Sequence, residues 1–211
     1  MWQSIGYYGA LVLESVVGIF GIRLYEEPRY DVIDRVGTRL EIRRYAPRLA
    51  AEVDLASAGG VGRGQAFQLL FAYIAGANRS AAFAQDTIAM TMPVEVGGKE
   101  LVAMTVPVET LEHAGTGHMR FFLPAKYTLG TAPKPLNPRV RLVTVSDEMI
   151  ATLRFSGSAA DVDERKVELI AKLAGTKWQP ASEPYSLFYD APFTLPFLRR
   201  NEAAVAVVKK P

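Results

Sequence analysis

The stretch Gln65–Glu109, QAFQLLFAYIAGANRSAAFAQDTIAMTMPVEVGGKELVAMTVPVE, contains the change of pattern that decides the fold. Its first part has apolar residues at the spacing i, i+3, i+4 and i+7, which predicts a helix with one apolar face. These residues are Phe67, Leu70, Phe71 and Ile74. Two β-like runs follow, Ile88–Val96 and Glu100–Glu109, and the pair Gly97-Gly98 between them is typical of a hairpin turn.

The order of strand, helix and further strands occurs twice from Tyr25 onward. Outside the opening stretch, the strands are predicted at Arg39–Leu55, Met119–Leu129, Arg139–Val145, Ile150–Phe155, Tyr185–Tyr189 and Ala203–Val208. A second helix is predicted to begin near Asp161, because Asp161 and Glu164 resemble a capping box, and to end at Gly175. The class is therefore α+β: a distorted antiparallel β-barrel from two β-α-β-β repeats, with two flanking helices and an N-terminal apolar helix. The proline-rich segment Thr131–Pro138 is interpreted as a loop rather than a linker between domains, because each half alone is too small to bury a core.

The composition excludes several classes of function. The 24 basic and 22 acidic residues give a net charge of +2 without a basic stretch, which argues against nucleic acid as a partner. The chain contains no cysteine, so disulfides, cysteine–zinc sites, iron–sulfur clusters and thiol nucleophiles are excluded. A hydrophobic fraction of 49% over 211 residues is sufficient to close a core.

Residues 1–24 form an apolar N-terminal segment that is distinct from the predicted domain at 25–211. The run Ile5–Leu24 is long enough to cross a bilayer, but Glu14 at its middle would be costly against lipid. The segment is therefore predicted to span a membrane, to bind a membrane or protein partner, or to pack on its own domain. Because arginines follow the run and none precedes it, a spanning segment would leave the domain cytoplasmic.

Several motifs resemble the SOUL heme-binding family. They are YDAPFTLPFLRRNEAAVAV from Tyr189, MRFFLPAKYTL from Met119, IAMTMPV from Ile88 and YIAGAN from Tyr73. The resemblance covers roughly Tyr25 to Lys209. It implies a tetrapyrrole ligand, heme or metal-free porphyrin, in a shallow apolar groove along the first helix and under the loop before the last strand. The function that it implies is transport, buffering or delivery of that ligand.

Within this resemblance, Phe67 and Phe71 are expected to contact the macrocycle, and Phe193 is expected to do so from the C-terminal loop. Leu70 and Ile74 are expected to belong to the core. Two lysines of the family's animal members are replaced by Ala72 and Thr194. Other cations would therefore have to bind the propionates, and the candidates are Arg63, Lys126, Arg199 and Arg200. The last two have a structural alternative, which is to pair with Glu202 or to bond loop carbonyls.

Candidates for an iron ligand are the two histidines of the chain, His118 and His113, with His118 preferred because it adjoins a strand. No serine, metal or nucleotide motif of known enzymes is present in the sequence. The alternatives to a binding protein are an enzyme that acts on the bound tetrapyrrole, for example by removing its metal, and a ligand-sensing adaptor.

Overall fold

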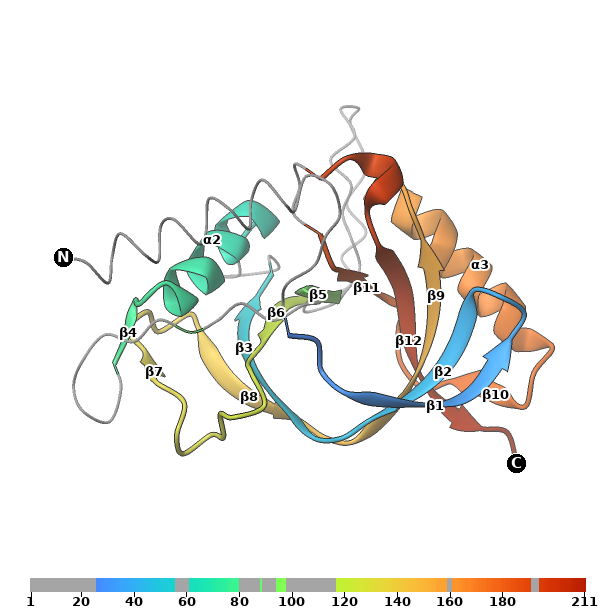
Figure 1. The fold of residues 1–211 in the computed structure, drawn as a ribbon, viewed down its shortest axis with the longest axis horizontal. Helices are drawn as coiled ribbons and strands as arrows, with labels where there is room; N and C mark the ends of the chain where they lie inside the picture. Colours follow the sequence, from blue (N-terminus) through green and yellow to red (C-terminus); the bar gives the residue numbers. More distant parts are fainter. Residues whose placement is uncertain are drawn as a thin grey trace, which may run out of the picture.

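The computed structural model describes residues 26–55, 61–79, 88, 94–97, 117–158, 161–190 and 194–211. Within these ranges one large, curled antiparallel sheet has the helices α2 (Arg63–Ile74) and α3 (Val162–Ala174) on its outside, as Figure 1 shows. The predicted α+β class, with a distorted barrel and two flanking helices, is confirmed. The predicted N-terminal helix lies outside the described residues.

The sheet has the strand order β1-β2-β9-β12-β11-β5-β6-β3-β8, and β10 also pairs with β12. The strands are β1 (Tyr30–Val36), β2 (Leu40–Tyr45), β3 (Arg48–Asp54), β5 (Val94–Gly97), β6 (His118–Phe122), β8 (Arg141–Val145), β9 (Glu148–Phe155), β10 (Trp178–Pro180), β11 (Tyr185–Phe188) and β12 (Asn201–Lys209). A separate short pair joins β4 (Asn78–Arg79) to β7 (Lys134–Pro135).

The two repeats exchange a strand with each other. The first repeat contributes the neighbours β3, β6 and β5, and the second contributes β9, β12 and β11 in the corresponding places. However, β2, which precedes β3 in the chain, pairs with β9, while β8, which precedes β9, pairs with β3. Each half therefore completes the sheet of the other. The proline-rich segment between the halves connects β6 to β8 and contains the short strand β7.

Alternation along the strands places one set of apolar side chains on the outside of the curl. Leu40, Leu153 and Val205 face outward and pack against Leu169 and Leu173 of α3 in one buried cluster. On the other side of the molecule, α2 covers the outward residues of β3 and β6, including Val53, Met119 and Phe121. Both helices thus contribute to the core from outside the sheet.

Several details differ from the sequence prediction. The sequence did not predict the strands β1 and β10. The predicted hairpin between Ile88–Val96 and Glu100–Glu109 is wrong at β5, because β5 pairs with β6 on one edge and with β11 on the other. Residues 100–109 themselves lie outside the described residues. Asp161 stands at the start of α3 but does not cap it: its Oδ2 accepts a hydrogen bond of 3.0 Å from the Ser158 backbone N–H. In the part of the chain that the structure describes, no helix is long and apolar enough to cross a membrane.

Candidate functional site

Strand β6 separates two surfaces of different chemistry. Met119 and Phe121 point outward into the cluster that α2 covers. The alternate residues His118 and Arg120 point to the inner face of the curl, where both contact Glu95 of β5. Phe67, which packs on Phe121, and His118 therefore lie on opposite faces of the sheet.

On the outer surface, α2 carries the predicted ligand-binding residues in one row. Arg63, Phe67 and Phe71 are spaced four residues apart and so follow one another along the same side of the helix. The rings of Phe67 and Phe71 stack with centroids 6.2 Å apart, and Phe67 meets the ring of Phe121 edge-on at 5.3 Å. Phe67 is thus anchored to the core, whereas Phe71 stays 40% exposed.

The remaining residues of the helix separate as expected. Leu70 and Ile74 are buried, at 0% and 4% exposure, and their assignment to the core is confirmed. Ala72, which replaces a family lysine, is exposed beside Phe71 and brings no charge to the ligand. The exposed surface of α2 therefore carries a stacked aromatic pair, with Arg63 four residues before Phe67 in the same row.

Lys126 does not join this group of residues. It lies between β6 and β7, and its Nζ is 5.0 Å from the ring centroid of Tyr127. Arg63, by contrast, begins α2. Lys126 thus lies on a loop outside the row on α2, and its contact with a propionate stays a prediction.

The C-terminal loop uses its arginines for structure. Nε of Arg199 donates a 2.7 Å hydrogen bond to the Thr194 carbonyl, and Arg200 donates to Glu202 through Nη2 at 2.9 Å. The structural alternative for these two arginines, carbonyl bonding and pairing with Glu202, is confirmed. Phe193 and His113 lie outside the described residues, so their predicted contacts with the ligand stay predictions.

His118 is held by a buried carboxylate. Its Nε2 lies 2.8 Å from Oε1 of Glu95, and Nη1 of Arg120 donates to the same oxygen at 2.7 Å. Burial by itself raises the pKa of Glu95, but the hydrogen bond from His118 and the charge of Arg120 outweigh it and hold that pKa below 4.5. Glu95 is therefore ionised at neutral pH, and it fixes the orientation of the imidazole.

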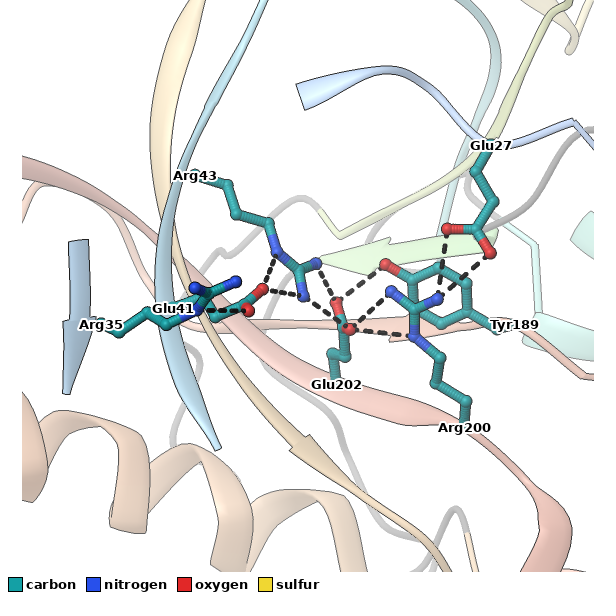
Figure 2. Close-up of polar contacts among 7 residues, drawn as sticks. All are labelled: Glu27, Arg35, Glu41, Arg43, Tyr189, Arg200 and Glu202. Atoms are coloured by element: carbon teal, nitrogen blue, oxygen red, sulfur yellow. Dashed lines mark hydrogen bonds and ion pairs between the residues drawn. The ribbon is translucent and has the colours of Figure 1, made fainter. Parts of the chain in front are cut away.

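A second buried network, shown in Figure 2, connects the inner face to the C-terminal loop. Glu202 is fully buried and accepts hydrogen bonds from Arg43 at 2.7 and 3.1 Å, and from the Tyr189 hydroxyl at 2.8 Å. The guanidinium of Arg200 also covers the Tyr189 ring at 3.8 Å. Burial by itself raises the pKa of Glu202, but the charges of Arg43 and Arg200 lower it by more than burial raises it. The carboxylate therefore stays charged.

The inner face of the sheet is thus lined by paired charges across several strands. Directly paired residues run from Glu202 through Leu187, Glu95, Arg120 and Glu52 to Arg141. Nε of Arg120 and Nη2 of Arg141 both donate to the carboxylate of Glu52, at 2.7 and 3.0 Å. Sequence reasoning missed this arrangement. The available signal was the alternation of charged and apolar residues in β2, β3 and β6.

Comparison with known families identifies the chain. The family model described as SOUL heme-binding protein matches residues 25–206, which is most of the sequence. The chain belongs to the SOUL family. No curated protein matches it.

Solved structures share the fold of this SOUL protein at low sequence identity. The EcmrR C-terminal domain has a TM-score of 0.56 and 8% identity, over 83% of this chain and all of that one. A structure described as a hydrolase from Listeria innocua has a TM-score of 0.53 and 12% identity, over 81% of this chain and 92% of that one. At these identities the likeness shows the fold alone.

The described residues of this SOUL protein fit a tetrapyrrole on α2 better than on the inner face. A flat apolar ring needs exposed carbon, which the stacked pair Phe67 and Phe71 supplies, and a propionate needs a cation, for which Arg63 is placed one turn away. On the inner face Glu95, Arg120 and Glu202 are already engaged with one another or with neighbouring charges. A dianionic ligand there would have to break buried ion pairs.

Proposed function

We propose that this SOUL protein binds heme or a metal-free porphyrin on the outer surface of α2 and carries, buffers or delivers it. The observation that supports this most directly is the exposure of Phe71. Its ring stacks on Phe67, which in turn packs on the core, and yet 40% of Phe71 stays open to solvent. An exposed aromatic ring on a rigid base is suited to a flat apolar ligand.

The proposal assigns Arg63 to one propionate and assigns no protein ligand to the iron. Arg63 precedes Phe67 and Phe71 in the same row, at the start of the helix. A macrocycle stacked on the two rings would have one edge toward Arg63. Ligation of iron by His118 stays a prediction. It would require the heme to bind on the inner face of the sheet, because the His118 ring lies on the side of β6 opposite to α2. Since apolar contact and one ion pair hold the ligand, modest affinity is expected, as suits a carrier that must release it.

The test is a titration of the full-length protein with hemin, followed by the Soret band and by tryptophan quenching. We expect saturation at micromolar hemin for the wild type. Phe71→Glu removes the exposed ring and adds a charge that repels the propionates, so it should weaken binding about tenfold, or about 1.4 kcal/mol. The matched control is Val167→Glu, because Val167 is 72% exposed on α3, away from the proposed surface.

Two results would count against the proposal. One is hemin binding by Phe71→Glu with the affinity of the wild type. The other is an equal loss in Phe71→Glu and Val167→Glu, which would indicate a general effect of charge.

A further inference from the structure

The segment Thr194–Arg200 exposes two large apolar side chains, those of Leu195 and Phe197. It contains the short helix η2 (Pro196–Leu198), in which Phe197 is 71% exposed, and Leu195 just before it is 38% exposed. Single exposed apolar residues are common on protein surfaces, but Leu195 and Phe197, separated only by Pro196, form a local apolar tip.

This exposure is a property of the fold, because hydrogen bonds hold the segment at several points. The Gly157 N–H donates to the Pro196 carbonyl at 3.0 Å, and the Arg199 side chain donates to the Thr194 carbonyl at 2.7 Å. At the end of the segment, the Arg200 N–H donates to Oδ2 of Asp190 at 2.6 Å. With its backbone fixed in this way, the tip does not fold back to bury Phe197.

The chain enters the described part of the structure beside the end of this segment. Glu27 accepts hydrogen bonds from Nη1 of Arg200 at 3.1 and 3.2 Å, so the incoming chain is tied to the residue that ends the tip (Figure 2). Leu24 precedes Glu27 by three residues, and three residues span at most about 10 Å. The apolar run Ile5–Leu24 therefore ends within about 10 Å of Glu27, whatever its conformation.

We propose that Leu195 and Phe197 enter the surface of a lipid bilayer, next to the point where the run Ile5–Leu24 enters the same bilayer. Two independent features lead to this partner. One is an apolar run of bilayer length, and the other is a hydrogen-bonded apolar tip three residues before Arg200, which binds Glu27 just after that run. Phenylalanine and leucine are side chains that interfacial segments insert. Contact with lipid would thus fix the orientation of the domain relative to the membrane.

The test places a tryptophan reporter at the tip of the full-length chain. Phe197→Trp is compared with Val167→Trp, since Phe197 and Val167 are 71% and 72% exposed and neither substitution disturbs the core. Trp2 is replaced by phenylalanine in both proteins, and the buried Trp178 is common to both. The probe is a vesicle of phosphatidylcholine with phosphatidylglycerol, prepared with and without brominated acyl chains.

We expect vesicles to shift the emission of the Phe197→Trp protein to the blue and brominated chains to quench it, while the Val167→Trp protein shows neither change. Three outcomes would overturn the proposal. The protein fails to sediment with vesicles, it sediments while the reporter at 197 keeps its emission in water, or both reporters respond equally. The second outcome would show that the N-terminal segment binds lipid without the tip, and the third that binding does not depend on orientation.

Discussion

The outer and inner faces of the curled sheet are built from the same strands but are stabilised in different ways. Outward side chains such as Leu153 and Val205 are apolar and are covered by α3, so their burial supplies hydrophobic stabilisation. Inward side chains such as Glu202 and Arg43 are charged and buried, so they are compatible with folding only because they are paired. The difference teaches that alternation in a strand can mark two buried faces rather than one buried and one solvated face.

The largest expected effect is the loss of one partner in the inner network. Glu202→Ala leaves the buried guanidinium of Arg43 facing Arg200 without the carboxylate between them. We expect the free energy of unfolding, measured with urea, to fall by about 3–5 kcal/mol. The double variant Arg43→Met with Glu202→Leu removes both charges and should recover part of this loss. A double variant as unstable as the sum of its single substitutions would show that the pair is not coupled.

A comparable but simpler loss is expected on the outer face. Leu153→Ala removes a fully buried side chain beneath α3. The neighbours of Leu153 in this cluster are apolar, so the substitution leaves no charge without a partner. The free energy of unfolding should fall by about 2–5 kcal/mol through lost transfer energy and the remaining cavity. Val167→Ala, at an exposed position of α3, is the control and should change stability little. Equal destabilisation by the two variants would contradict the assignment of this face to the core.

The smallest of these effects concerns pH. The pKa of Glu95 is lower in the folded protein than its ordinary value of 4.5. Its charge therefore stabilises the fold above about pH 4.5, and this contribution is lost as the pH falls through the folded value. The stability difference between wild type and Glu95→Gln should accordingly shrink below pH 4.5 in acid-unfolding curves. Glu183→Gln, on an exposed turn, is the control. A difference between wild type and Glu95→Gln that is constant over the acid range would contradict the ion pairing of Glu95.

The sequence predicted the outer face better than the inner face, and the reason is physical. Helical spacing in α2 and the continuous apolar run Ala203–Val208 in β12 are local patterns, so they can be recognised within one segment. Strand β1 was missed because its residues are mostly exposed and carry no clear alternation. Glu202 stands 159 residues away from Arg43, so no local pattern could predict the contact between them.

The candidate site shows the same limit. Phe67, Phe71 and Arg63 were predicted as a group and lie in one row, because helical periodicity determines which residues share a side. His118 was preferred to His113 as an iron ligand because it adjoins a strand, and that proximity does not tell which face of the sheet its side chain takes. That face followed only from the register of β6 with β3 and β5.

The most direct test of the central claim is the absorption spectrum of the hemin complex of His118→Ala beside that of the wild type. If the macrocycle lies on α2, the two Soret maxima should coincide, and the hemin affinity should be unchanged, because His118 lies on the inner face of β6 with its ring held by Glu95 at 2.8 Å. A shifted Soret maximum in His118→Ala, together with normal hemin binding by Phe71→Glu, would place the heme inside the curl and contradict the account.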